Sequence, residues 1–101
     1  MSKGINFAIG KKVIVRGSTA GVWFGTLCKK KKNEVVLCNA RRLGVWIKPD
    51  PSMVADVSLH GITKGQCQVS GMVKTVWFEA IEIIPTTPEA AKSIEEADDG
   101  N

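Results

Sequence analysis

The stretch most decisive for the fold is Gly21–Trp46, GVWFGTLCKKKKNEVVLCNARRLGVW. β-Branched and aromatic residues lie on both sides of a lysine run, which is typical of two strands joined by a tight turn. We expect strands over Val22–Lys29 and Glu34–Asn39. Asn33 is the candidate left-handed residue of the turn between them.

The strand pattern continues over Ala40–Ile47, where Gly44 predicts a bulge or a close approach of the backbone. Lys11–Arg16 is expected to form a strand before this unit. Cys67–Ser70 and Val73–Ile84 are expected to form two strands after it.

Two helices are expected around the closing strands. Ser52–His60 has apolar residues near helical spacing, with Ser52 placed to cap its start and Gly61 to end it. Thr87 followed by Pro88 is a helix-start signature, and the last residues, DDGN, are expected to fray. Lys48–Ser52, which holds two prolines, is expected to be a connection.

The predicted fold is mainly β, a small antiparallel SH3-like or Sm-like barrel of five or six strands with a short insert helix and a C-terminal helix. We expect one barrel domain over residues 1–85, with the insert helix at about 52–60, and an acidic helix or tail over 86–101. At 101 residues the chain has room for one compact domain.

The net charge of +4 is unevenly distributed. Residues 1–85 hold 13 Lys and Arg against 5 Asp and Glu, whereas residues 86–101 hold one Lys against five acids. A basic body attracts anions, and an acidic tail either competes for that surface or only aids solubility. We predict an anionic partner.

The sequence contains no motif that indicates metal binding, catalysis or membrane association. Cys28, Cys38 and Cys67 form no CxxC pair with a nearby His, so we expect no metal and interpret all three as reduced core residues of an intracellular protein. His60 is the only histidine, and no phosphate-binding glycine motif is present. We therefore predict a non-enzyme without a cofactor. With no signal peptide and no apolar run near 20 residues, we expect a cytoplasmic protein without membrane contact.

The candidate binding residues lie near the end of the opening stretch. Arg41 and Arg42 point to opposite faces of a regular strand. Arg41 would share its face with Asn39, Leu43 and Val45, and Arg42 would share its face with Cys38, Gly44 and Trp46. A guanidinium beside an indole, with a glycine between them, leaves space for a phosphate and a base. The candidate ligand-binding residues are Arg42, Trp46, Arg41, Asn39, Gly44 and Trp23.

Each of these sequence features also has a purely structural interpretation. Arg42 and Trp46 can equally be a surface cation beside a core tryptophan. The run Lys29–Lys32 is either a solvated hairpin tip or a finger that attracts phosphates. In each of the pairs Trp23–Phe24 and Trp77–Phe78 one ring must point outward, so we expect a homo-oligomer that buries these rings.

Two resemblances add to this interpretation. KVIVRGSTAGVWFGTLCKKKKNEVVLCNA, Lys12–Ala40, resembles the first half of an Sm-like barrel, although lysines replace the usual acidic turn and no R-G follows Val73. VIVRGSTAGVWFGTL, EVVLCNARRL, VSLHGITKG and EAIEIIPTTPEAAKSI resemble an uncharacterised family of small bacteriophage proteins, most specifically in NARRL and IEIIP.

The phage resemblance implies an infected host cell as the setting. Small phage proteins without catalytic groups include sponges that sequester host immune signalling nucleotides, and this is the function we predict first. A barrel that binds single-stranded nucleic acid is the alternative, and it should show a strong salt dependence. A virion or protein-interaction module is a further alternative.

Overall fold

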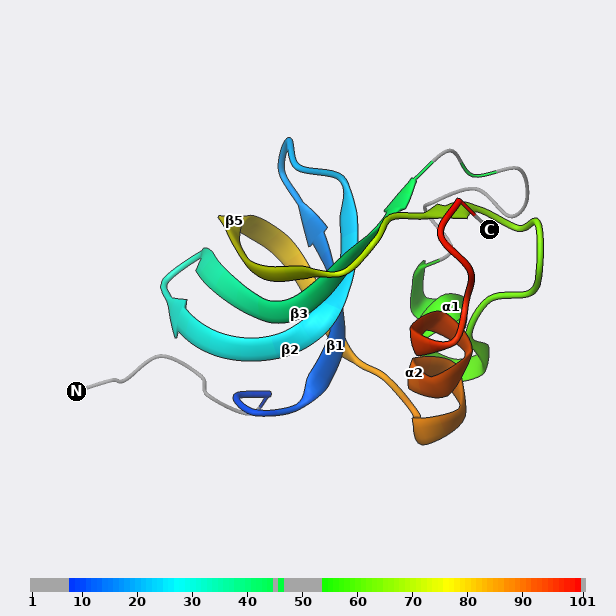
Figure 1. The fold of residues 1–101 in the computed structure, drawn as a ribbon. Coiled ribbons are helices and arrows are strands. Elements are labelled where there is room, and N and C mark those ends of the chain that lie inside the picture. Colours follow the sequence, from blue (N-terminus) through cyan, green and yellow to red (C-terminus); the bar gives the residue numbers. More distant parts are fainter. Residues whose placement is uncertain (1–7, 45, 47–53, 101) are drawn as a thin grey trace.

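Four antiparallel strands pair in a closed circuit. The computed structural model describes residues 8–44, 46 and 54–100. In this circuit β1 pairs with β2 and β5, and β3 pairs with the same two strands. Figure 1 shows the curved strands wrapping around one another. The elements are β1 (Lys12–Gly17), β2 (Val22–Lys31), β3 (Glu34–Gly44), α1 (Val54–His60), β4 (Gln68–Val69), β5 (Val73–Pro85) and α2 (Pro88–Glu95).

This arrangement confirms the predicted small antiparallel barrel with an insert helix and a C-terminal helix. The fifth strand, β4, is only two residues long and pairs with Leu43 and Gly44 at the end of β3. It extends the sheet beyond the circuit, on the side where the two helices lie (Figure 1).

A bulge in β3 lies at Asn39, not at Gly44 as the sequence predicted. The β2–β3 register passes from Phe24 opposite Arg41 to Thr26 opposite Cys38, so two residues of β3 face Gly25 alone. Asn39 takes a left-handed φ of 52°, and a Cβ on Gly25 would lie 3.1 Å from Ala40 Cα. Gly25 therefore accommodates the bulge, whereas a Cβ on Gly44 would meet nothing within 4 Å.

Two apolar clusters lie on opposite faces of the sheet. Along β1, Val13 and Val15 belong to one cluster and Ile14 to the other, as the two-residue period of a strand requires. The first cluster fills the barrel with Leu27, Val35, Leu37, Ala40 and Ala80. The second joins Val22, Phe24 and Leu43 to buried residues of the helices and β4.

The helices follow their predicted end signals. Thr87 Oγ1 accepts a hydrogen bond from Ala90 N at 3.1 Å, and Pro88 is the first residue of α2. Gly61 ends α1 with a φ of 78°. The two helices pack together at one end of the barrel (Figure 1). The predicted cap Ser52 and the connection Lys48–Ser52 lie outside the described residues.

The hairpin turn between β2 and β3 is a two-residue loop, since Lys31 pairs with Glu34. Its left-handed residue is Lys32, with a φ of 54°, so the prediction of Asn33 was wrong. Nζ of Lys30 donates to the carbonyl of Lys32 at 2.7 Å, which holds the turn.

The cysteines differ from the prediction of three reduced core residues. Cys28 and Cys38 form a disulfide between β2 and β3, and both are only half-buried. Only Cys67, which is outside the disulfide, lies in the core. The spacing rules that exclude zinc do not reveal that two neighbouring strands bring these sulfurs together.

The two aromatic pairs behave differently from each other. Phe24 is buried, but Trp23 does not point into solvent, because its ring lies 6.2 Å from that of Phe78. Trp77 is the exposed ring, with 70% of its surface accessible. Only one of the two outward rings on which the expected homo-oligomer was based is therefore exposed, and the homo-oligomer stays a prediction.

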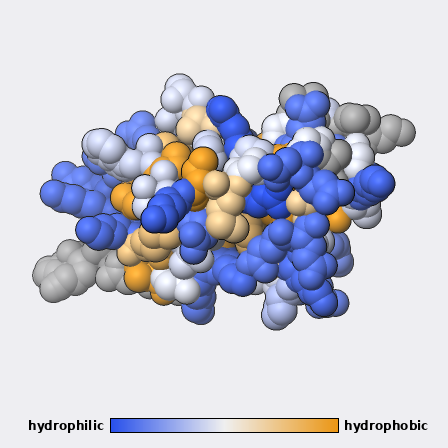
Figure 2. Space-filling model, in the orientation of Figure 1, coloured by the Kyte–Doolittle hydropathy of each residue, from blue (hydrophilic) through white to orange (hydrophobic). Residues whose placement is uncertain are grey.

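Figure 2 shows apolar surface gathered over the barrel, with hydrophilic side chains around it and over the helices. Neither helix in the described part of the chain is long and apolar enough to cross a membrane.

Candidate functional site

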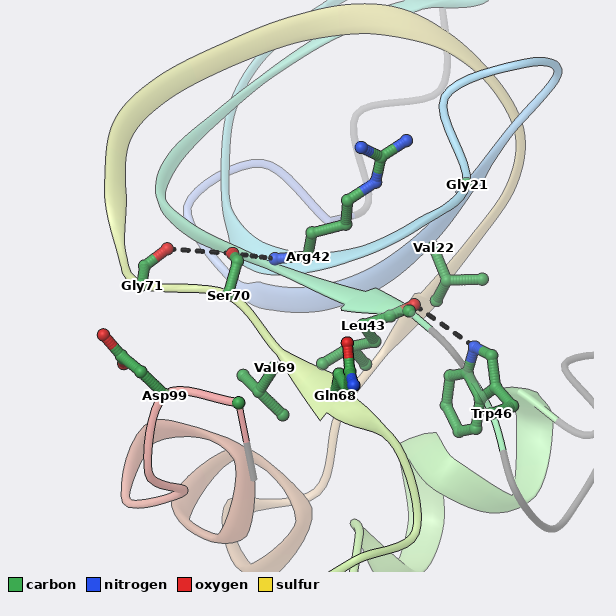
Figure 3. A pocket seen from close by; sticks show the side chains of 12 residues that line it. Gly21, Val22, Arg42, Leu43, Trp46, Gln68, Val69, Ser70, Gly71 and Asp99 are labelled. Carbon is green, nitrogen blue, oxygen red and sulfur yellow. Dashed lines mark hydrogen bonds between the residues drawn. The ribbon is translucent and has the colours of Figure 1, made fainter.

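An open pocket of about 640 Å³ lies where β3, β4 and the chain after α2 meet (Figure 3). Much of its wall is backbone, because four glycines contribute to it. Its volume falls in the range usual for small-molecule sites. The lining residues are Gly21, Val22, Arg42, Leu43, Gly44, Trp46, Gln68, Val69, Ser70, Gly71, Asp99 and Gly100.

Arg42 supplies the positive charge of this pocket. Its guanidinium carbon lies 5.6 Å from the centre of the Trp23 ring, and Nη2 donates to the carbonyl of Ala20 at 2.9 Å. Among the described residues, the Ala20 carbonyl is the only hydrogen-bond acceptor of the Arg42 guanidinium. The guanidinium is therefore held in place while most of its five donors remain available to a ligand.

Trp46 lines the same pocket at the end away from the Arg42 guanidinium (Figure 3). Its indole N–H donates to the carbonyl of Leu43 at 3.2 Å, and its ring packs against the apolar cluster on the helix side. Gly44 and the amide of Gln68 also line the pocket. Charge and aromatic surface thus occupy different ends of one cavity.

Arg41, predicted to bind ligand, is instead built into the fold. It is 4% exposed. Nε donates to the carbonyl of Ser70 at 2.8 Å, and Nη1 donates to the carbonyls of Ile94 and Ala97 at 2.9 and 2.7 Å. The two Nη1 contacts satisfy carbonyls at and after the end of α2, where the helical hydrogen-bond pattern stops. The Ile94 carbonyl also accepts from the N–H of Ala97 at 3.3 Å. Arg41 is therefore a positioning residue of the chain end.

Within the DDGN segment that was expected to fray, Asp99 and Gly100 are held. Arg41 Nη2 donates to the Asp99 carboxylate at 2.8 Å. The N–H of Gly100 donates to the carbonyl of Val69 at 2.8 Å. Because Asp99 and Gly100 line the pocket, Arg41 shapes one of its walls through them.

Trp23 and Asn39, the remaining predicted site residues, lie outside the pocket lining. Trp23 lies beneath Arg42 and donates its indole N–H to the carbonyl of Ala20 at 3.0 Å. It supports Arg42 rather than lining the cavity. Asn39 is exposed at the bulge.

The bulge also corrects the predicted faces. Before it, Leu37 points into the barrel and Cys38 points outward. After it, the alternation is shifted by one residue, so Arg42 lies over the barrel-side residue Trp23 and does not share a face with Cys38. The predicted pairing of Arg41 with Leu43 holds, since both lie on the helix side.

The sequence pattern did not point to the β4 and tail residues. Ser70 Oγ accepts from the backbone N–H of Arg42 at 2.8 Å and donates to the carbonyl of Gly71 at 2.9 Å. Ser70 and Asp99 lie 28 and 57 positions beyond Arg42 in the chain. Only the pairing of β4 with β3 and the anchoring of the tail bring them to the site.

Titratable groups are dispersed in the described part of the chain. His60 is exposed in the last turn of α1. The described residues contain no group of three or more His, Cys, Asp or Glu side chains placed to hold a metal ion. Burial raises the pKa of the Cys67 thiol to about 11, so this thiol is protonated at neutral pH.

No curated protein and no solved structure gives a significant match to this chain. One protein family does match, over residues 10–94, which covers the barrel, both helices and most of the pocket lining. The chain therefore belongs to the family described as Domain of unknown function (DUF6948).

Proposed function

We propose that this protein binds a small anionic nucleotide in the pocket between Arg42 and Trp46 without converting it. The observation that carries the proposal is that both side chains line one open cavity, at opposite ends of it. A phosphate would contact the guanidinium of Arg42 and the nucleobase would lie near the indole of Trp46.

The charges of the pocket favour one orientation of such a ligand. The Asp99 carboxylate lines the cavity and would repel a phosphate placed beside it. Arg42 projects toward the Gly21 loop, away from Asp99 (Figure 3). The phosphate therefore belongs at the Gly21 end, where glycine leaves room for close approach, and the amide of Gln68 is available to a base edge.

Retention without turnover suits a sequestering protein. The resemblance to small bacteriophage proteins adds the proposal that the ligand is a host immune signalling nucleotide, held in the cytoplasm of an infected cell. A pocket that only retains its ligand needs no general base or nucleophile. This proposal includes the non-enzymatic character and the self-association expected from the sequence.

Isothermal titration calorimetry with cyclic dinucleotides, cyclic ADP-ribose and linear mononucleotides tests the proposal. We expect one ligand class to bind at micromolar concentration or below, with one ligand per pocket. Arg42→Ala should weaken binding at least tenfold, because it removes the charged donors. Recovery of the unchanged nucleotide after incubation would support sequestration.

Arg16→Ala is the matched control. It removes the same charge from β1, where Arg16 donates to Glu82 at 3.1 Å and does not line the pocket. Equal losses in the two variants would contradict the proposed pocket, and so would the absence of binding by every nucleotide tested. Sedimentation velocity on the same samples measures the oligomeric state.

A further inference from the structure

A second surface of the barrel, distinct from the pocket, centres on Trp77. This ring is 70% exposed in the middle of β5. Its indole N–H donates to the Glu34 carboxylate on β3 at 2.9 Å, which fixes the orientation of the ring. A large aromatic side chain that is both exposed and oriented presents a flat face to solvent.

Strand register places lysines beside this ring. Val36 pairs with Trp77 on one side and with Lys29 on the other, so the three form a row across β5, β3 and β2. Lys31 lies in the next row, opposite Glu34. Neighbouring strands lie about 4.8 Å apart, so the lysine side chains reach the space above Val36. We call the surface formed by Lys29, Lys31, Glu34, Val36 and Trp77 the Trp77 face.

The Trp77 face is hollow and positively charged on its β2 side. A cavity of about 410 Å³ is lined by its five residues together with Lys30. Among the described residues, Lys29 and Lys31 form no ion pair with a carboxylate. Oε1 of the Glu34 carboxylate accepts the hydrogen bond from the indole N–H of Trp77. Two exposed ammonium groups beside a fixed indole match a phosphate next to a stacked base.

The disulfide supports this surface. Cys28 precedes Lys29 in β2, and Cys38 follows Val36 by two residues in β3. Cross-linking these strands limits how far the lysines can move relative to Val36 and Trp77. A surface held in this way loses less conformational freedom when a ligand binds.

We propose that the Trp77 face binds single-stranded nucleic acid, with a base stacked on Trp77 and the flanking phosphates on Lys29 and Lys31. A second copy of this chain fits the surface less well, because exposed polar residues interrupt its apolar row. Along β5, Thr75 and Glu79 separate Trp77 from Val73 and Ile81. The phosphates would lie on the side of Trp77 toward β2, where the lysines are, because the carboxylates of Glu34 on β3 and Glu79 on β5 would repel them elsewhere.

Fluorescence anisotropy with labelled dT and rU oligonucleotides of about a dozen nucleotides, a length within the range of known single-strand sites, tests this assignment. We expect the logarithm of the binding constant to fall with the logarithm of salt concentration with a slope of about −1.4, which corresponds to two phosphate contacts. Trp77→Ala should weaken binding at least fivefold at constant salt. Lys29→Gln with Lys31→Gln should abolish most of the salt slope.

The matched control is Lys64→Gln with Lys92→Gln, which removes the same charge from exposed positions outside the Trp77 face. This variant should bind the oligonucleotides as the natural chain does. Circular dichroism would check that each variant is folded. We expect all of them to fold, because the replaced side chains are exposed and such substitutions change stability little.

Three results would overturn the assignment. The first is no binding of either oligonucleotide at low salt. The second is an equal loss in the control variant, which would indicate attraction by net charge alone. The third is a dimer, seen by sedimentation and lost in Trp77→Ala, that excludes the oligonucleotide, because it would assign the Trp77 face to a second copy of the chain.

Discussion

Arg41→Ala should destabilise the fold severely, although the residue is an arginine on a basic protein. Arg41 makes hydrogen bonds to the carbonyls of Ser70, Ile94 and Ala97 and to the Asp99 carboxylate. Each bond from a charged donor stabilises by about 1.5–3 kcal/mol, but the bonds share one side chain and do not add. We expect a loss of about 3–5 kcal/mol, because removal of the guanidinium takes the donor from several carbonyls at once, at about 1–3 kcal/mol for each acceptor left unsatisfied.

Such a loss is large beside the total stability. Domains of this size unfold with a free energy of about 5–15 kcal/mol. Urea denaturation followed by tryptophan fluorescence gives the change directly, provided that the m-value is unchanged. Arg41→Lys should recover only part of the loss, because an ammonium cannot span acceptors that the planar guanidinium reaches at once.

Asp99→Asn is the control that identifies the origin of the effect. The Asp99 side chain is 76% exposed, so its ion pair with Arg41 is screened by water and contributes below about 1 kcal/mol. The carbonyl contacts of Arg41 therefore carry most of the stabilisation. If Asp99→Asn costs as much as Arg41→Ala, or if Arg41→Ala costs less than about 1 kcal/mol, the carbonyl explanation is wrong.

Three further predictions follow from other contacts. Reduction of the Cys28–Cys38 disulfide, which closes a loop of sequence separation 10, should lower the free energy of unfolding by about 2–3 kcal/mol. The Cys28→Ser, Cys38→Ser variant should not respond to reductant, and alkylation of both thiols in untreated protein would contradict the bond. The pKa of Cys67, about 11 in the folded chain against 9.0 for an ordinary thiol, means that the folded state binds more protons between these values. The free energy of unfolding should therefore fall as pH rises from 9 to 11, by more than in Cys67→Ala; parallel pH profiles would refute this. Gly61→Ala should destabilise by about 2–3 kcal/mol in thermal unfolding, because Gly61 has a φ of 78° and its Cβ would clash with Ser93 Oγ and lie 3.0 Å from Ala90 Cα. Gly65→Ala, with a φ of 82° and no atom near its Cβ, should cost only about 1 kcal/mol, and equal costs would exclude crowding as the cause.

Local patterns in the sequence predicted most elements of the fold correctly. Runs of β-branched and aromatic residues bounded by glycine or proline identified β1, β2 and β5. Thr87, Pro88 and Gly61 predicted helix ends that the structure confirms. These signals depend on a few neighbouring residues, so they can be recognised without knowing the tertiary structure. The errors at Asn33 and Gly44 have a different cause. In each case the feature lies at another non-glycine residue: Lys32 takes the left-handed conformation expected of Asn33, and Asn39 forms the bulge expected at Gly44.

The candidate site was predictable only in part. Arg42, Gly44 and Trp46 were proposed from their spacing, and all three line the pocket. The opposite wall, including Ser70 and Asp99, depends on pairing of β4 with β3 and on the anchored chain end. No short-range pattern encodes such contacts, because they join segments separated by tens of residues.

The two neighbouring arginines show how a single bulge determines the location of the site. They share the same chemistry, and their positions in the sequence differ by one. The extra residue at Asn39 shifts the alternation of β3, which sends Arg41 to the end of α2 and Arg42 onto Trp23. The guanidinium of Arg41 then donates its hydrogen bonds to carbonyls of the fold, whereas the guanidinium of Arg42 keeps donors for a ligand. Without the bulge the two roles would be exchanged, since an unbroken strand would turn Arg41 toward Trp23 and Arg42 toward the helices. Gly25, which leaves room for the bulge, therefore contributes to the pocket although it lines no part of it.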